Sequence, residues 1–563
     1  MRGNAVLQFT IVAALLLSPA AATPRQVRAD PGPTPSVTVS SPDDVFLNEG
    51  FTLSLSFDNT GDATGFGPVV ELMVPPGVDA DESTASFLGM PVNVMDTGTF
   101  DSSGQLTNPM TGLDVTGPED YRLLIVEYPL GSFTDDQPAA VFTIDCTLNS
   151  EAALGEAETF LANPLFRFGA DAEDNPTVDP PIFGTQGTDD VVPTVITLEK
   201  GNDAPENETA TGPNYPVTYT LTVAIATNAD IEDLQVTDQL PGNLQFVQVT
   251  NDGGASSVSE PSTSVPGGTL VFDFAGTVTG VSGPDITIEY IVYAPELDDA
   301  DNAVIDPATG AAVTAGNNAE ADGEYEDGDS GVGVSADADY TLTLRSIAIQ
   351  KGSSIVTDMG PSGTSPGDTV EYTIEFQISD YFAFEDIVIT DVIGDGQTFL
   401  DSPAPHLTVT EQGTSGDWDF TDPGTYSSTH DSSTGETTVV FDVSQLIADN
   451  SFGVNENGSL EGDEYTDETH DGQPATGTLT LRASIDEACE NPASYPDGDE
   501  WLGAGDSTGN TVDIAANLLG TSTGLTNSSA ASVTIATPTL DKSVYAINGN
   551  TSPADFKVAP GET

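Results

Sequence analysis

The stretch PVTYTLTV, residues 216–223, decides the fold class because apolar and polar residues alternate along it. The stretch TVEYTIEF, residues 369–376, alternates in the same way. A period of two places every second side chain on one face of an extended strand, so each stretch predicts a strand with one buried face. Short segments of this kind, separated by turns rich in the 56 glycines and 39 prolines, predict an all-β chain of sandwich domains.

Both strands belong to an internal repeat. A lysine precedes each of them, in VITLEKGND (195–203) and SIAIQKGSS (346–354), and an aspartate lies on the next strand. Tyr219 precedes Asp238 by 19 residues, and Tyr372 precedes Asp391 by the same 19. A Gly-Asn pair opens a late strand of each copy, at 316–317 and 509–510. Equal spacing inside one chain indicates that a structural unit has been duplicated.

The repeats and the changes of composition divide the chain into six segments. The acidic stretches 321–331 and 460–473 are expected to be loop insertions in the repeats. The third repeat opens near Lys542, and the sequence ends within it. The expected segments are a signal peptide (1–22), a linker (23–35), an N-terminal β-sandwich domain (36–190), a first repeat (191–343), a second repeat (344–536) and a truncated third repeat (537–563).

The start of the chain predicts export. Arg2, an apolar run over 5–17 and small residues at 20–22 form a secretory signal pattern. No later run reaches the ~18 apolar residues of a membrane-spanning helix, so an anchor is expected beyond Thr563. With 90 acidic against 11 basic residues and a net charge of −79, the chain lacks the cationic surface that nucleic acids and anionic membranes require. A secreted or cell-surface location follows as the expectation.

The repeat motifs resemble a known family. The first-strand lysine, PGDTVEYTI (366–374), VTDQLPG (236–242) and the late GNNA (316–319) are similar to a tandem repeat of prokaryotic surface proteins called domain of unknown function eleven. The resemblance covers about 195–563 and implies tandem immunoglobulin-like β-sandwiches. The second repeat departs from the pattern, with Ile393-Gly394-Asp395 in place of Leu-Pro-Gly. The region before 191 lacks the lysine.

Lysine, aspartate and asparagine from three strands can meet inside a sandwich core. Burial favours a neutral amine and a protonated acid, and the amine can then attack the asparagine carboxamide and release ammonia. The product is an intramolecular isopeptide bond. The proposed sets are Lys200, Asp238 and Asn317 in the first repeat, and Lys351, Asp391 and Asn510 in the second; Asn318, Asn517 and Asn527 are alternative acceptors.

Two other interpretations of these residues stay open. Lysine and aspartate can form an ordinary ion pair that fixes strand register. Alternatively, the lysine caps a domain junction and the aspartate closes a turn. The N-terminal domain lacks both residues and has Leu72 or Met73 at the place of the aspartate, which favours a joint role for the pair.

Catalysis, metal binding and disulfide formation have weaker support in the sequence. His406, His430 and His470 have neither zinc-ligand nor catalytic-triad spacing, so no enzyme activity and no required cofactor are expected. Calcium is possible at the acidic segments 171–179, 298–306 and 495–506, although none matches a complete calcium loop. Cys146 and Cys489 fall in different predicted domains, so no disulfide is expected between them.

The sequence therefore predicts a structural, adhesin-like repeat protein that forms a stalk of β-sandwich modules. Two alternatives remain: a module that binds carbohydrate or protein through its N-terminal domain, and the non-catalytic region of a larger secreted enzyme. Other surface proteins or glycans are the possible partners.

Overall fold

The computed structural model describes residues 32–149, 151–170, 180–281, 283–327, 330–359, 363–465, 472–495, 498 and 500–536. The expected signal peptide and third repeat lie outside the described residues. The described chain is all-β, as predicted, and its α-helical content is one helix, α1 (Val443–Asp449). It divides into two compact units, and the boundary in the sequence lies between Thr194 and Val195.

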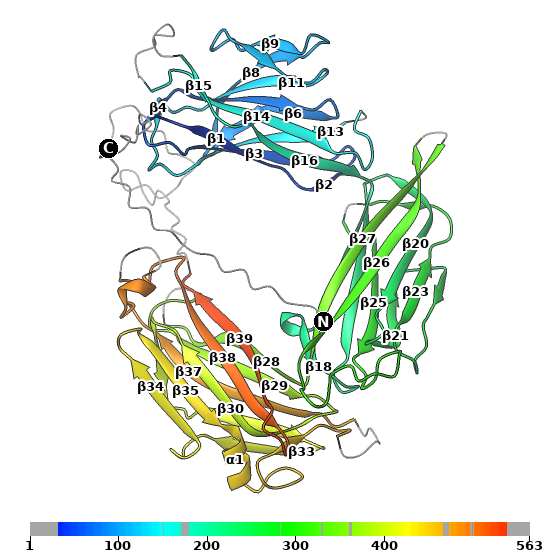
Figure 1. The fold of residues 1–563 in the computed structure, drawn as a ribbon, viewed down its shortest axis with the longest axis vertical. Coiled ribbons are helices and arrows are strands. Elements are labelled where there is room, and N and C mark those ends of the chain that lie inside the picture. Colours follow the sequence, from blue (N-terminus) through cyan, green and yellow to red (C-terminus); the bar gives the residue numbers. More distant parts are fainter. Residues whose placement is uncertain are drawn as a thin grey trace, which may run out of the picture. The chain divides into compact units, whose positions relative to one another are not determined.

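The N-terminal unit is a sandwich of two main sheets (Figure 1). One sheet has five strands, in the order β1 (Pro35–Ser40), β3 (Gly50–Asn59), β13 (Ala140–Leu148), β6 (Val78–Phe87) and β7 (Met90–Pro91). The other has seven, in the order β2 (Asp44–Phe46), β16 (Gly187–Thr194), β14 (Glu158–Phe166), β5 (Pro68–Val74), β11 (Arg122–Glu127) and β8 (Asn93–Thr99), with β15 (Ile182–Phe183) beside β14. Two small ribbons pair β9 (Gln105–Thr107) with β10 (Asp114–Thr116) and β4 (Gly65–Phe66) with β12 (Ser132–Phe133).

Burial on both faces explains why the sequence of β5 is apolar at every position except Glu71, instead of alternating. All seven of its residues are buried. Val70 and Leu72 join the main core, and Val69 and Met73 join a second apolar cluster that also contains Phe100. A strand that is covered on both faces needs apolar residues at successive positions.

The second unit begins with a sandwich built from the first repeat. Its first sheet runs β17 (Ile196–Asn202), β19 (Val217–Ile225), β25 (Ile286–Tyr293) and β21 (Gln245–Asp252). Its second sheet runs β18 (Glu208–Ala210), β27 (Ser330–Arg345), β26 (Val313–Asp327), β20 (Asp230–Leu240), β23 (Gly268–Asp273) and β22 (Ser257–Ser259), with β24 (Val278–Thr279) beside β20.

The second repeat forms a sandwich of the same plan. Its first sheet runs β28 (Ile347–Thr357), β29 (Thr369–Ile378), β37 (Ala475–Ile485), β32 (His406–Glu411) and β33 (Thr414–Asp419), with β31 (Gln397–Leu400) beside β37. Its second sheet runs β34 (Tyr426–Asp431), β35 (Glu436–Asp442), β30 (Ala383–Ile393), β38 (Ser507–Leu518) and β39 (Gly524–Thr534), with β36 (Leu460–Glu461) beside β30.

Strand register shows that the two repeats are equivalent. Lys200 lies opposite Leu221, and Lys351 lies opposite Ile374. On the facing sheets Asp238 lies opposite Ala319, and Asp391 lies opposite Val512. Asn317 is two positions before Ala319, and Asn510 is two positions before Val512. Because side chains two positions apart share a face, the aspartate and the asparagine of each repeat point into the same core.

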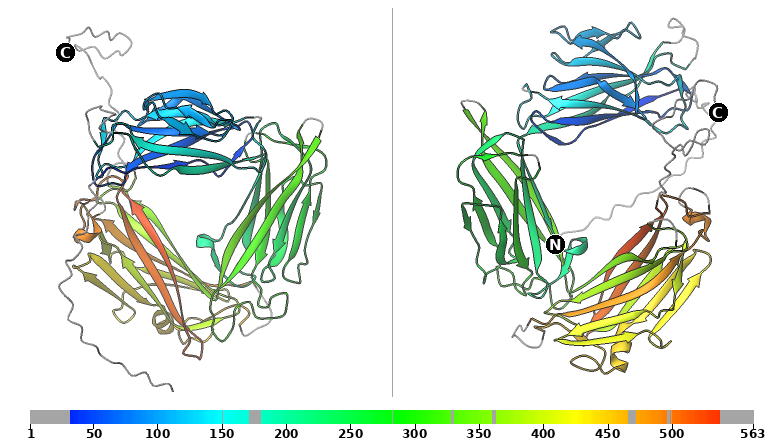
Figure 2. Two further views of the ribbon diagram at one scale, coloured as in Figure 1. Left: turned by 45° about the horizontal axis from the view of Figure 1, so that its top comes forward. Right: turned by 180° about the vertical axis from the view of Figure 1, so that it is seen from behind.

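The prediction of a loop over 321–331 is wrong. The hairpin of β26 and β27 is paired from Val313 opposite Leu344 to Asp327 opposite Ser330, and Figure 2 shows these two long strands side by side. Acidic and small residues alternate in this segment, so the carboxylates can stay hydrated while the backbones pair. The second predicted loop, 460–473, contains β36 and a turn up to 465, and 466–471 lie outside the described residues.

Candidate functional site

The first candidate site, called site one, consists of Lys200, Asp238 and Asn317. Lys200 extends from β17 and forms an ion pair with Asp238, which lies on β20 of the facing sheet. Neither side chain has any exposed surface. Asn317, on the adjacent strand β26, is also fully buried. The structure thus brings all three predicted residues into one core, across both sheets of the sandwich.

Tyr290, on β25, links the other members of site one. Its hydroxyl donates a hydrogen bond to Asp238 Oδ2 at 2.8 Å and accepts one from Asn317 Nδ2 at 2.8 Å. Its ring stacks on Tyr219 with centroids 5.6 Å apart, and the Tyr219 ring lies 5.3 Å from Lys200 Nζ. Sequence reasoning missed Tyr290, because an aromatic residue in the alternating segment ITIEYIVY is typical of ordinary core packing.

The second candidate site, called site two, consists of Lys351, Asp391 and Asn510. Lys351 on β28 and Asp391 on β30 form an ion pair with no exposed surface on either side chain. The Tyr372 ring lies 4.8 Å from Lys351 Nζ, and its hydroxyl donates to Gln397 at 2.6 Å. Asn510 is fully buried on β38. The two sites therefore share a lysine, an aspartate, an asparagine and an aromatic ring in the same arrangement.

The register also shows where the sites differ. Tyr219 lies opposite Tyr290 in the first repeat, whereas Tyr372 lies opposite Leu481 in the second. Site two therefore has no hydroxyl where site one has that of Tyr290. Among the described residues, neither Nδ2 nor Oδ1 of Asn510 has a hydrogen-bond partner.

Burial drives both ion pairs toward their neutral forms. Desolvation lowers the pKa of Lys200 and of Lys351, and the negative charge of each aspartate opposes this effect. Desolvation likewise raises the pKa of Asp238 and of Asp391 against the charge of each lysine. A neutral amine is a nucleophile, so the same burial that destabilises the charges activates the lysines.

The sites also contain buried polar atoms that lack partners within the described chain. They include one oxygen of Asp238, one oxygen of Asp391 and the side-chain oxygen of Asn317, in addition to the two atoms of Asn510. A buried polar atom without a partner costs about 1–3 kcal/mol. Two repeats that retain this cost at the same place indicate a role other than packing.

The alternative asparagines have other environments. Asn318 is exposed. Asn517 donates to Asp386 at 3.0 Å, and Asn527 accepts from the Ile349 backbone at 2.6 Å. The asparagines that the structure places in the two cores with the lysines are Asn317 and Asn510.

The N-terminal unit contains a buried carboxyl group of a different kind. Leu72 joins the main apolar core, whereas Glu71, one position earlier on β5, faces away from it. Glu71 is 2% exposed and accepts hydrogen bonds from Asn108 at 2.8 Å and Asn163 at 3.3 Å. Desolvation raises the pKa of Glu71. The apolar run around it concealed this cluster from sequence reasoning.

Other candidate groups have ordinary surroundings. His406 pairs with Asp419 and His430 with Glu490, while His470 lies outside the described residues. In the part of the chain that the structure describes, no three acidic, histidine or cysteine residues are grouped as metal ligands. Asp298, in the candidate calcium segment 298–306, accepts backbone hydrogen bonds within its own turn. The segment 171–179 is not among the described residues, and 495–506 is described only in part.

The structure also describes both cysteines and the apolarity of its helices. Cys146 and Cys489 are buried free thiols. Within the described ranges, no helix is both long and apolar enough to cross a membrane.

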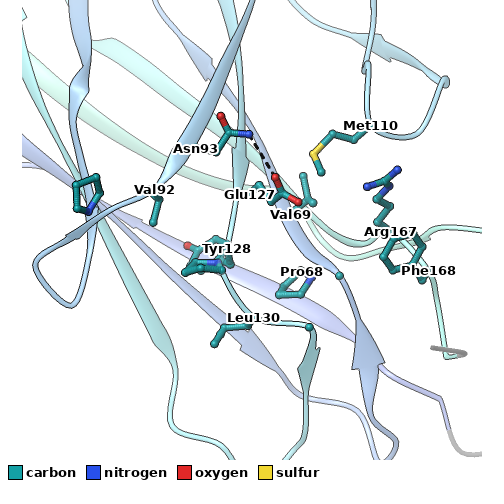
Figure 3. Close-up of a pocket in the computed structure, with 14 residues that line it drawn as sticks. Pro68, Val69, Val92, Asn93, Met110, Glu127, Tyr128, Leu130, Arg167 and Phe168 are labelled. Atoms are coloured by element: carbon teal, nitrogen blue, oxygen red, sulfur yellow. Dashed lines mark hydrogen bonds between the residues drawn. The ribbon is translucent and has the colours of Figure 1, made fainter. Parts of the chain in front are cut away.

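A cavity of about 380 Å³ lies in the N-terminal unit (Figure 3). Pro68, Val69 and Leu130 provide apolar walls, and Arg167 lies beside Phe168 with its guanidinium 4.8 Å from the ring centroid. The ion pairs formed by arginines in the described chain involve Arg122, Arg345 and Arg482, not Arg167. Glu127 also lines the cavity and accepts a hydrogen bond from Asn93 at 3.3 Å, and Arg167 has no ion-pair partner among the described residues.

Comparisons with known proteins give structural likeness only. No family model and no curated protein matches the chain. Among solved structures, the full-length major pilin SpaD of Corynebacterium diphtheriae is similar at 12% identity, over 80% of this chain and 82% of that one, with a TM-score of 0.21. The collagen binding domain of the Erysipelothrix rhusiopathiae surface protein RspB is similar at 12% identity, over 61% of this chain and 97% of that domain, with a TM-score of 0.18.

A 35 kDa C-terminal fragment of the major pilin GBS80 of Streptococcus agalactiae is similar at 13% identity, over 55% of this chain and 91% of that fragment, with a TM-score of 0.18. These proteins are bacterial pilins and surface proteins. At TM-scores this low, the likeness does not bear on the function of this chain.

Proposed function

We propose that this chain is a secreted or cell-surface structural repeat protein in which each tandem sandwich forms one lysine–asparagine isopeptide bond. The observation that carries the proposal is the ion pair of Lys200 with Asp238, fully buried together with Asn317, and its repetition at Lys351, Asp391 and Asn510. A stalk-like role follows from tandem sandwiches that are covalently braced. The signal pattern at residues 1–22 supports export.

The reaction uses only groups of each site. A proton moves from the lysine ammonium to the aspartate, and the neutral Nζ attacks the asparagine Cγ. The Cγ–Nδ2 bond breaks, ammonia leaves, and the aspartate remains protonated. The protonated acid can donate to the new amide carbonyl and accept from the new amide N–H. Bond formation therefore gives partners to the polar atoms that lack them in the unreacted site.

The position of the bond suits a mechanical role. Lys200 and Asn317 belong to different sheets of one sandwich, and so do Lys351 and Asn510. A bond between them joins the two sheets through the core, where main-chain hydrogen bonds do not connect them. It also closes a loop of more than 100 residues, and closing a loop of about 100 residues is worth about 4.7 kcal/mol in the chain-entropy model of crosslinks.

The decisive experiment is the intact mass of the full chain, followed by peptide mapping. We expect a mass lower by two molecules of ammonia, with one peptide pair crosslinked through Lys200 and Asn317 and another through Lys351 and Asn510. The variants K200M and K351M should each restore one ammonia. A full mass for the wild-type chain would reject the proposal and leave the two clusters as ion pairs that fix strand register.

The cavity beside Arg167 favours a second function, recognition of a protein ligand by the N-terminal unit. A guanidinium that has no carboxylate partner among the described residues, next to apolar walls, suits a peptide that ends in an apolar residue with a free carboxylate. Labelled peptides of this type should bind the full chain, and amidation of the peptide or the R167M substitution should abolish binding. Equal binding of amidated peptides would remove this function from consideration.

A further inference from the structure

A continuous path of polar contacts runs through site one. Lys200 Nζ contacts Asp238 Oδ2, and the same oxygen accepts the hydrogen bond of the Tyr290 hydroxyl at 2.8 Å. That hydroxyl in turn accepts from Asn317 Nδ2 at 2.8 Å. The path therefore connects the nitrogen that must lose protons in the proposed reaction with the nitrogen that must gain one. Both hydrogen bonds of Tyr290 are within the 2.6–3.2 Å reach required of a proton-transfer group.

We propose that Tyr290 is a catalytic residue of site one, which relays a proton from Asp238 to the departing nitrogen of Asn317. This inference rests on the proposed isopeptide reaction and adds a residue that no sequence motif indicated. Tyr290 touches both the acid and the leaving group, so it acts on the reacting atoms directly.

The protons balance along this path. Lys200 begins as an ammonium and loses two protons, because the product amide nitrogen retains one hydrogen. The first proton stays on Asp238, which ends as a neutral acid. For the second proton the Tyr290 hydroxyl turns from Asp238 toward Asn317 Nδ2, and three transfers occur together as the Cγ–Nδ2 bond breaks. Tyr290 gives its hydroxyl proton to Nδ2, Asp238 gives the proton it already holds to the Tyr290 oxygen, and the second Lys200 proton replaces it on Asp238, so that both relay groups stay neutral. The Cγ–Nδ2 bond breaks with its electron pair on nitrogen, and neutral ammonia leaves.

The surroundings of Tyr290 suit a relay that starts and ends as a neutral phenol. Burial, together with the nearby Asp238 charge, raises the pKa of the Tyr290 hydroxyl well above its ordinary value. The stacked ring of Tyr219 fixes the orientation of the Tyr290 ring. The hydroxyl thus remains protonated, between its two partners, until the leaving nitrogen becomes basic in the tetrahedral intermediate.

Site two provides an internal comparison, because Leu481 occupies the register position of Tyr290. Asp391 lies beside Asn510 and can protonate its leaving nitrogen directly, without a hydroxyl at the position of Tyr290. General acid catalysis of this kind contributes about 10²–10⁴-fold to a rate. We expect the bond of site one to form faster than that of site two in the same chain.

The test follows bond formation in the full chain, made by cell-free synthesis and stopped with acid at intervals. Intact mass and peptide mapping report each site separately. In the Y290F variant the ring and its stacking are retained, and we expect the Lys200–Asn317 bond to form at least about tenfold more slowly. The Lys351–Asn510 bond should form at its wild-type rate, which shows that the variant chain folds.

Each outcome separates this inference from the function on which it rests. If neither bond forms in the wild-type chain, the proposed function itself fails. If both bonds form and Y290F leaves the rate at site one unchanged, the relay is rejected and the proposed function stands. If Y290F also slows site two, its effect is on folding and the relay is rejected as well. Selective slowing at site one supports it.

Discussion

Lys351 and Asp391 belong to different sheets of one sandwich, and their charged groups meet with no exposed surface on either side chain. An ion pair in this place has lost the hydration of both charges. The compensation is incomplete, because one oxygen of Asp391 has no hydrogen-bond partner in the described structure. The pair is therefore a poor device for stability alone, which favours a reactive role.

Removal of the acceptor asparagine isolates the contribution of the crosslink. The variants N317A and N510A keep both ion pairs but cannot form one of the two bonds. Each should lose about 4–5 kcal/mol of unfolding free energy, since an open loop regains its conformational entropy. Chemical denaturation of the full chain measures this loss. A matched change at the exposed Asn318, N318A, should leave the loss of two ammonia molecules and the stability unchanged.

Removal of one or both charges measures how strongly Lys351 and Asp391 interact when no isopeptide bond can form. In the N510A background, D391L leaves the Lys351 ammonium buried without its partner and should cost about 3–5 kcal/mol. The double change K351M/D391L should recover most of this loss, because it removes both desolvated charges. A double-mutant cycle by urea denaturation gives the coupling energy. Additive losses would mean that the two side chains do not interact.

The N-terminal unit should lose stability as the pH rises through the pKa of Glu71. Burial raises this pKa above the ordinary value of 4.5, so the folded state binds the proton more tightly than the unfolded state. The stabilising contribution is complete below pH 4.5 and is lost as the pH rises through the folded-state value. E71Q should remove this pH dependence, measured as the difference in thermal midpoint between variant and wild type. If the difference in thermal midpoint between E71Q and the wild type stayed constant as the pH rises from 4.5, Glu71 would not be the group that titrates.

The aromatic core of the N-terminal unit should be sensitive to truncation. Phe57 is fully buried, and its ring centroid lies 5.3 Å from that of Tyr128, 5.6 Å from Phe133 and 5.4 Å from Phe166. F57A should therefore lower the unfolding free energy by about 3–5 kcal/mol. The control F183A, at an exposed position of β15, should stay within about 0.5 kcal/mol of the wild type.

Salt should stabilise the chain by screening its negative charges. A net charge of −79 destabilises the compact state by self-repulsion, and ions screen this repulsion. Sodium chloride should therefore raise the thermal midpoint. At matched ionic strength an equal rise in calcium chloride is the result expected of charge screening alone. A larger rise of the thermal midpoint that saturates with calcium concentration would reveal a calcium site formed by carboxylates of the chain.

The sequence by itself indicated the β-sandwich class, the duplication, and the lysine and aspartate of each site, with Asn317 and Asn510 among several candidate asparagines. Alternation with a period of two is a local signal, since it depends only on which face of a strand is buried. The lysine, aspartate and asparagine were visible because they recur at corresponding positions of two repeats.

Only the tertiary structure decided which residues complete the sites. Tyr290 contacts Asp238 and Asn317 on the facing sheet, and no local pattern distinguishes it from a core aromatic residue. Glu71 was hidden in an apolar run because its partners come from remote segments. The length of the β26–β27 hairpin likewise depends on pairing between two strands, whereas the acidic composition of 321–331 alone favoured a loop. Contacts between segments that are distant in the chain are set by packing, and packing is not written in any single stretch of sequence.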